Sequence, residues 1–187
     1  MSGPQSNSLG LALTRPVVLI GLMGAGKSSV GRRLANALNV SFADSDTEVE
    51  LAAGRSVPEI FQDLGEPAFR DGERRVIARL LAEVPGVLAT GGGSFINEDT
   101  RALIMKNGIS VWIDADLDTL WARVKSRPGR PLLETADPKA TLAQLLQDRS
   151  PVYAMAELTV RSEPDQPHDA VVNRILAALM PSDRHSQ

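Results

Sequence analysis

The chain has 187 residues, 43% of them hydrophobic, and no cysteine, so disulfide bonds are excluded and one compact domain with a sizeable core is expected. A formal net charge of −3 and only seven Phe, Trp and Tyr residues give neither a general attraction for nucleic acid nor a base-stacking platform. No apolar run approaches the roughly 20 residues that span a bilayer. No signal-peptide pattern is present, and we therefore expect a cytoplasmic protein without nucleic-acid or membrane partners.

The ends of the chain differ from its centre. Residues 1–14 are rich in Ser, Gly, Asn and Pro with little apolar periodicity, and we expect a loose leader there. Residues 15–180 are expected to form a single domain, and residues 181–187 a frayed tail. No repeat of fixed period and no low-complexity tract interrupts the domain.

Within the domain, short apolar runs alternate with segments whose apolar residues recur every three to four positions. The runs are typical of strands buried on both faces of a parallel sheet, and the other segments of helices that cover it. In chain order we expect a strand at 16–20, a helix at 27–39, a strand at 40–43, a helix starting at Thr47, helices at 56–65 and 67–84, a strand at 87–90, a helix at 97–108, a strand at 109–113, helices at 117–124 and 139–147, a strand at 158–161 and a helix at 168–180. This alternation predicts an α/β fold of three layers, with five parallel strands between helices, but it does not give the strand order.

The segment between the first strand and the first helix, GLMGAGKS at 21–28, fits the phosphate-loop pattern G-x-x-x-x-G-K-[ST]. Its glycines allow the backbone amides to approach phosphate oxygens, and the following helix directs its positive dipole end at the bound anion. Lys27 is suited to the β- and γ-phosphates and the Ser28 hydroxyl to Mg²⁺. ATP and Mg²⁺ are therefore the expected ligands. The Asn-Lys-x-Asp guanine reader of switching GTPases is absent from the sequence.

Two carboxylates, Asp44 and Asp46, follow the second expected strand on a segment that we expect to be still extended. Ligands of parallel α/β proteins bind at the carboxyl ends of strands, which favours a binding role. The alternative is that Asp46 only caps the helix starting at Thr47, and both roles can coexist.

Three glycines, Gly91–Gly93, follow the third expected strand, where bare backbone amides suit a bound ligand. Arg70 lies in the preceding helix one turn from Glu73, with which it can form an ordinary surface ion pair. Gly72 in the same helix indicates close packing, because glycine costs up to about 1 kcal/mol there relative to alanine.

Arginines are dense in the breaker-rich segment 126–131, which is either a solvated loop or a lid whose guanidinium groups close on a triphosphate. Arg149 lies further on, after the helix at 139–147. Arginines suit a carboxylate through paired N–H···O bonds, and an aspartate suits hydroxyls. Together with Asp46 and Arg70, Arg149 therefore indicates a small polyhydroxy acid as the second substrate.

Six stretches follow one another along the chain: GLMGAGKSS, Asp44-Ser45-Asp46, GRSVPEIFQDLGEPAFRDGE, TGGG, Arg130-Pro131-Leu132-Leu133 and Arg149-Ser150-Pro151-Val152-Tyr153. Their order and spacing resemble those of the shikimate kinase family, and they extend from Gly21 to Tyr153. The combination is far more specific than the phosphate loop alone. The resemblance implies a P-loop kinase fold like that of nucleoside monophosphate kinases, with strand order 2-3-1-4-5 and with lid and substrate-binding insertions. It also implies a monomer.

The activity implied by the resemblance is transfer of the ATP γ-phosphoryl group to the 3-hydroxyl of shikimate, a step toward chorismate and the aromatic amino acids. Lys27, Asp46 and Arg130 would be catalytic. The implied nucleotide-binding residues are Gly24, Ala25, Gly26, Lys27, Ser28, Ser29, Arg123, Arg130 and Gln166; those for the acid are Asp46, Arg70, Gly91, Gly92, Gly93 and Arg149; and those for the metal are Ser28 and Asp44.

Two of these assignments have alternatives of their own. Arg123 is suited to lie against the adenine or to be a solvated helix residue. Family members often place an arginine beside the adenine after the last strand, where this chain has Glu163-Pro164-Asp165-Gln166-Pro167, so Gln166 is the expected residue at that position.

Two other functions also stay open from the sequence. One is a related kinase for another sugar acid such as gluconate, which shares the loop and fold. The other is a non-catalytic nucleotide-binding regulator, which needs neither an acceptor aspartate nor a lid arginine.

Overall fold

The structure, a computed structural model, describes residues 13–83 and 86–180. A five-stranded sheet in the order β2-β3-β1-β4-β5 forms its centre, and all neighbouring strands are parallel. The strands are β1 (Val17–Ile20), β2 (Ser41–Asp44), β3 (Gly86–Ala89), β4 (Ile109–Ala115) and β5 (Leu158–Ser162). This confirms the predicted fold class and the strand order that the resemblance implied.

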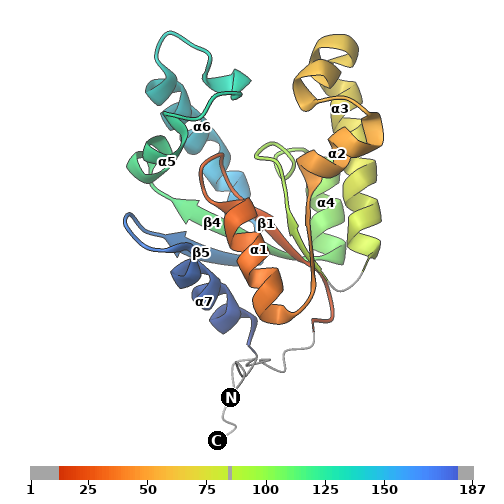
Figure 1. The fold of residues 1–187 in the computed structure, drawn as a ribbon, viewed down its shortest axis with the longest axis vertical. Helices are drawn as coiled ribbons and strands as arrows, with labels where there is room; N and C mark the ends of the chain where they lie inside the picture. Colours follow the sequence, from red (N-terminus) through yellow and green to blue (C-terminus); the bar gives the residue numbers. More distant parts are fainter. Residues whose placement is uncertain (1–12, 84–85, 181–187) are drawn as a thin grey trace, which may run out of the picture.

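Helices cover both faces of this sheet, as Figure 1 shows. The pair α1 and α7 packs together on one face, and α4 and α6 lie behind it. The helices are α1 (Lys27–Leu38), α2 (Ser45–Ala53), α3 (Val57–Ala82), α4 (Glu98–Asn107), α5 (Leu117–Val124), α6 (Pro138–Tyr153) and α7 (His168–Leu179), with a short 3₁₀ helix η1 (Pro131–Leu133) between α5 and α6.

The central strand β1 decides where the ligand sites lie. All four of its residues are completely buried, and β3 and β4 flank it in register. Because parallel strands end at the same edge, the loop after β1 lies beside the segments that follow β2, β3 and β4. The fold therefore brings the expected phosphate loop, the paired aspartates and the triple glycine to one edge of the sheet.

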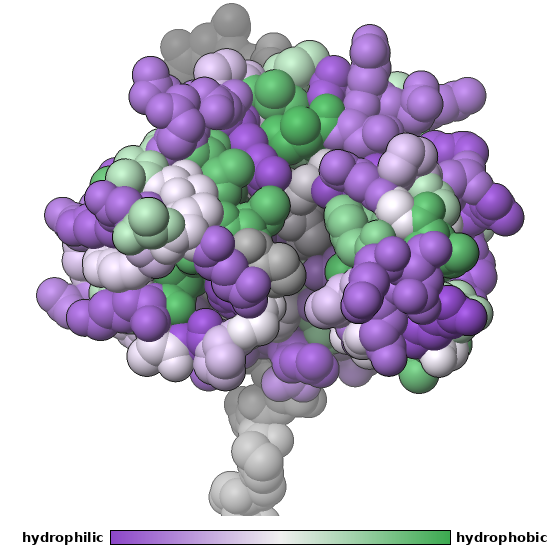
Figure 2. All heavy atoms as spheres, turned by 90° about the horizontal axis from the view of Figure 1, so that it is seen from above, coloured by the Kyte–Doolittle hydropathy of each residue, from purple (hydrophilic) through white to green (hydrophobic). Residues whose placement is uncertain are grey.

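Two groups of helices stand beyond this edge, α2 with α3 on one side and α5, η1 and α6 on the other (Figure 1). Seen from above, the surface is hollowed between the two groups (Figure 2). In the described part of the chain, no helix is both long and apolar enough to cross a membrane.

Two predicted elements differ from the structure near functional residues. The second helix begins at Ser45 rather than Thr47, and its cap is Asp44, whose side chain accepts a hydrogen bond of 3.0 Å from the Asp46 amide. The expectations that Asp46 caps the helix and that the segment is still extended there are therefore wrong. The helix α6 continues to Tyr153 because that ring is completely buried, which outweighs the bond lost at Pro151.

Two further predictions concern glycines of the helix α3. Gly65 has non-helical dihedrals inside it, φ +81° and ψ 169°, so a break lies where the sequence predicted one. The close packing expected at Gly72 is wrong, because a Cβ there would meet nothing within 4 Å. The expected leader, apart from residues 13 and 14, and the expected tail lie outside the described residues.

Candidate active site

The loop between β1 and α1 depends on glycine geometry. Gly21, Gly24 and Gly26 have φ values of +145°, +82° and +91°, which favour a residue without a side chain. A Cβ at Gly24 would lie 2.8 Å from Val124 Cγ1. The left-handed Gly26 is also the N-cap of α1, so the unpaired amides of that helix and its dipole form an anion site.

Lys27 lies under this loop rather than in solvent. Its ammonium donates to the carbonyl oxygens of Gly21, at 2.7 Å, and Leu22, at 3.0 Å. Burial lowers the pKa of Lys27 from 10.5 to about 8, against the opposing effect of Asp46 and Asp44. A phosphate would offer this charge a stronger partner than the two carbonyls.

Ser28 and Asp44 provide two oxygens at the same point. The Ser28 hydroxyl donates to Asp44 Oδ2 at 2.6 Å. A hydroxyl and a carboxylate are ligands that suit Mg²⁺, which keeps waters and takes phosphate oxygens for its remaining positions. Among residues 13–83 and 86–180, no group of three or more His, Cys, Asp and Glu side chains could hold a metal ion alone. The two oxygens therefore fit a metal that arrives with a phosphorylated ligand.

Asp46 is held in the first turn of α2, next to the glycine turn. Burial, followed by the negative charges of Asp44 and Glu73, raises its pKa from 3.8 to about 6, although Lys27 acts in the opposite direction. Its carboxylate thus titrates close to neutral pH, as acid–base groups of active sites commonly do.

Each of the three glycines after β3 faces a different side chain. A Cβ at Gly91 would lie 2.8 Å from Asp46 Oδ1, and one at Gly92 would lie 3.4 Å from Arg149 Nη1. A Cβ at Gly93 would overlap the guanidinium of Arg70. The absence of a Cβ at Gly91 and Gly93 therefore leaves room for the side chains of Asp46 and Arg70, and Gly92 lies in ordinary contact with Arg149.

Hydrogen bonds from three other elements hold this turn. The Gly91 amide donates to the buried Ser45 Oγ at 3.2 Å, and the Tyr153 hydroxyl donates to the Gly92 carbonyl at 2.6 Å. Thr90, just before the turn, donates through Oγ1 to the Leu19 carbonyl at 2.9 Å. The turn is thus tied to α2, α6 and β1.

Arg70 is paired with a fully buried carboxylate, so the surface ion pair considered from the sequence is wrong. Glu73 is 0% exposed, accepts from Arg70 Nη1 at 2.8 Å and accepts from Ser94 Oγ at 2.5 Å. On its other side, Arg70 Nε lies 3.5 Å from Glu66 Oε1. These two contacts hold the guanidinium against Gly93.

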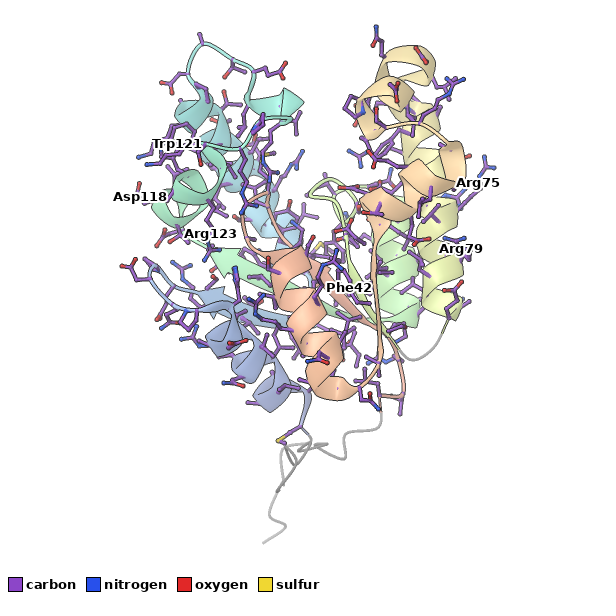
Figure 3. All side chains as sticks on the ribbon, in the orientation of Figure 1. Phe42, Arg75, Arg79, Asp118, Trp121 and Arg123 are labelled. Carbon is purple, nitrogen blue, oxygen red and sulfur yellow. The ribbon has the colours of Figure 1, made fainter. Side chains whose placement is uncertain are left out.

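Arg123 reaches from α5 toward the phosphate loop, whereas Asp118 on the same helix points outward (Figure 3). Its Nη1 donates to the carbonyl oxygens of Gly24, at 3.1 Å, and Ala25, at 3.3 Å, and its Nη2 donates to Ser162 Oγ at 3.3 Å. The alternative of a solvated helix residue is therefore wrong. Burial and Arg127 lower the pKa of Arg123.

Arg130 is half-buried at the lid, and its Nε is enclosed without a hydrogen-bond partner in the described structure. Burial, then the charge of Arg127, lowers its pKa. Arg123, Arg127 and Arg130 line one cavity together with Lys27, and this excess of positive charge over the two aspartates of the cavity favours an anionic ligand.

Most of the residues expected at the site line two adjoining cavities. The first, about 320 Å³, is lined by Gly24, Gly26, Lys27, Ser28, Ser29, Asp44, Asp46, Gly91, Gly92, Arg123 and Arg130. The second, about 180 Å³, is lined by Arg70, Gly93 and Arg149 and shares Gly92 and Arg130 with the first. Two expected residues, Ala25 and Gln166, line neither cavity.

The first cavity also has four lining residues that the sequence did not nominate: Met23, Thr90, Arg127 and His168. Met23, Thr90 and Arg127 lie inside segments that the sequence analysis had singled out, so those segments were the available signal. His168 begins α7 directly after the breaker run 163–167, and only the placement of α7 beside α1 brings it to the cavity.

The chain matches the family model described as "Shikimate kinase" over residues 23–180. It is 56% identical over 174 residues to a shikimate kinase of Caulobacter vibrioides, covering 93% of this chain and 86% of the relative. A relative of the same name from Bradyrhizobium diazoefficiens is 51% identical over 178 residues, covering 95% and 86%.

Solved structures agree with these matches. The shikimate kinase of Acinetobacter baumannii, in complex with shikimate, is 34% identical with a TM-score of 0.85, covering 92% of this chain and 96% of that one. A gluconokinase from Sinorhizobium meliloti is 21% identical with a TM-score of 0.59, covering 90% and 93%, and shows a shared fold only.

The buried carboxylate of Glu73 gives a stability prediction. In Glu73→Gln the negative charge that pairs with Arg70 is lost, and we expect the free energy of unfolding to fall by about 1–3 kcal/mol in urea titrations. The control Glu157→Gln removes an exposed pair with Arg15 and should change it by less than about 1 kcal/mol. Equal effects of the two substitutions would contradict the structural role of Glu73.

Proposed function

The chain belongs to the shikimate kinase family, and from this premise we propose that it transfers the γ-phosphoryl group of ATP to the 3-hydroxyl of shikimate. The products are ADP and shikimate 3-phosphate, on the route to chorismate and the aromatic amino acids. One observation carries the proposal: Asp46, Arg149 and Arg70 each pack against one of three consecutive glycines, directly beside the phosphate loop. We also propose that the protein acts as a cytoplasmic monomer.

In the acid half of the site, we assign the carboxylate of shikimate to Arg70 and Arg149. Both guanidinium groups line the second cavity, and paired N–H···O bonds give them orientation as well as charge. The backbone of Gly91, Gly92 and Gly93 would lie against the ring. This binding aims the ring hydroxyls at Asp46, which lines the first cavity.

In the phosphate half, Lys27 and the amides of Gly24, Ala25, Gly26, Ser28 and Ser29 would hold the phosphates. Ser28 and Asp44 would hold Mg²⁺, which when bound neutralises part of the phosphate charge. Arg123 would lie beside the nucleotide, and Gln166 is the residue that the resemblance assigned to the adenine.

The reaction needs a hydroxyl oriented in line with the γ-phosphorus and charge stabilisation as the bond to the β-bridging oxygen breaks. Asp46 in its ionised form accepts a hydrogen bond from the 3-hydroxyl and takes its proton as the new O–P bond forms. Lys27 and Arg130 stabilise the charge on the transferring group. Arg130 suits this role because it lines both cavities, between the two substrates.

The proposal is tested by measuring ADP release in a coupled assay with shikimate, quinate and gluconate as acceptors. We expect release with shikimate and little with the other two acids. Preferential release with gluconate would favour the related sugar-acid kinase. Bound ATP with no transfer to any of the three acids would favour a nucleotide-binding regulator.

Arg149 gives a prediction on acid binding. A charge-assisted hydrogen bond contributes about 1.5–3 kcal/mol, so Arg149→Ala should weaken shikimate binding by roughly 10- to 150-fold in calorimetry. Arg75 points from α3 away from the cavities (Figure 3), and Arg75→Ala serves as the matched control with unchanged affinity. Unchanged affinity in Arg149→Ala would refute the carboxylate assignment.

Arg130 gives a prediction on turnover. By analogy with arginine fingers, Arg130→Ala should lower kcat by roughly 10³–10⁵ while the acid still binds. The exposed Lys125 precedes the same lid, and Lys125→Ala is expected to keep kcat. Turnover near that of the wild type at saturating ATP would remove Arg130 from the catalytic step.

The shifted pKa values predict the pH profile of kcat/KM, measured with both substrates below saturation so that the free protein is reported. Asp46 is active when ionised, so activity should rise as the pH passes through about 6. Lys27 loses its charge above about 8, so activity should fall there. The exposed-site control Asp118→Asn should keep both limbs. An acidic limb centred near pH 4 would contradict the raised pKa of Asp46.

A further inference from the structure

We propose that His168 forms the wall of the cavity against which the nucleoside of ATP packs, in place of Gln166. The inference deepens the proposed function, on which it rests, by naming the residue that recognises the nucleoside. It starts from the cavity at the phosphate loop, whose lining includes His168 but not Gln166.

The direction of the nucleotide follows from the position of the acid site. The γ-phosphate must face Gly92 and Asp46, where the acceptor lies, so the rest of the nucleotide extends away from them. The lining of the cavity also includes Ser29, Arg123 and His168, which come from α1, α5 and α7 rather than from the segments that carry Asp46 and Gly92. The nucleoside therefore reaches the space beside His168.

The charged groups that act on Lys27 and on His168 are different. The charged groups that act on Lys27 are Asp46, Asp44, Arg130 and Arg149. Those that act on His168 form a second set: Arg123, Arg33, Asp169 and Arg127. The two sets share no residue, so the charged groups around His168 differ from those around Lys27.

The imidazole has a fixed place in the fold. A Cβ on Gly26 would lie 3.1 Å from His168 Cε1 and 3.3 Å from Nδ1, so the ring covers the last glycine of the loop. The helix that carries it buries Val171, Val172 and Ile175, and the neighbouring Asp169 lies 3.3 Å from Arg33 of α1.

The state of the ring fits a nucleoside better than a phosphate. Burial lowers the pKa of His168, and the arginines at positions 123, 33 and 127 lower it further against the opposing charge of Asp169, which favours the neutral imidazole. A neutral flat ring offers a stacking face for a base or ribose, and it adds no charge to the phosphate end.

Gln166 is turned to another contact. Its side-chain nitrogen donates to Glu163 Oε2, within the same loop before α7. The side chain therefore makes a local bond at the loop, whereas the ring two residues later reaches the cavity.

The test compares a nucleotide with a chain of inorganic phosphates that has no nucleoside. ADP and inorganic tripolyphosphate are titrated, with Mg²⁺, into the wild type, His168→Ala, His168→Phe and Gln166→Ala. Stacking of a base on an aromatic ring predicts that His168→Ala weakens ADP by about 5- to 100-fold. Tripolyphosphate affinity should stay unchanged in all four proteins, His168→Phe should keep ADP affinity within a few-fold, and Gln166→Ala should match the wild type.

Three outcomes would overturn the inference: unchanged ADP affinity in His168→Ala, an equal loss for ADP and tripolyphosphate, or a loss carried by Gln166→Ala instead. An equal loss would mean that the ring acts on the loop through Gly26 rather than on the nucleoside. Because no acid is present in these titrations, their result is independent of whether shikimate is the acceptor, and failure here leaves the acceptor assay unaffected.

Discussion

The absence of side chains at Gly91 and Gly93 is the constraint on which the site depends. A Cβ at Gly91 or Gly93 would meet the carboxylate of Asp46 or the guanidinium of Arg70, and Gly92 lies against Arg149. The turn and the three charged groups therefore form one packed unit. Since β3 lies between β2 and β1, this unit has the paired aspartates on one side and the phosphate loop on the other. Strand order thus determines which two substrates meet.

The site also depends on how its negative charges are compensated. The carboxylates of Asp44, Asp46 and the completely buried Glu73 lie near one another, which is unfavourable unless cations and hydrogen bonds compensate them. Glu73 has Arg70 and the Ser94 hydroxyl, and Asp46 faces Lys27. Asp46 stays under-compensated, so its pKa rises to about 6, while burial lowers that of Lys27 to about 8. Burial disfavours the charged form of both groups and so moves both pKa values toward neutral pH. Asp46 can then accept a proton, and Lys27 can bind phosphate, in the same pH range.

Local patterns in the sequence were sufficient for the alternation of strands and helices, the phosphate loop and the segments that meet at the sheet edge. The strand order came from the resemblance, because pairing between strands is a tertiary property. Local reasoning failed where an outcome depends on distant contacts. Asp44 rather than Asp46 caps α2, because the actual start of the helix depends on how β2 ends. Glu73 had the spacing of a surface pair, and only the packing of α3 on the glycine turn buries it.

The two ends of the nucleotide cavity illustrate this difference. The phosphate end consists of one continuous stretch, Gly21–Ser28, whose backbone geometry requires glycines at fixed spacing and so leaves a readable motif. The other end is assembled from Gly26, Arg123 and His168, which belong to three separate elements and meet only through the packing of α5 and α7 around the loop. A contact made by a side chain through its shape depends less on backbone conformation than a phosphate loop does, so it can be made from different positions along the chain. The proposed role of His168 thus moves the nucleoside contact expected at 166 by two positions and leaves the chemistry at the phosphate end unchanged.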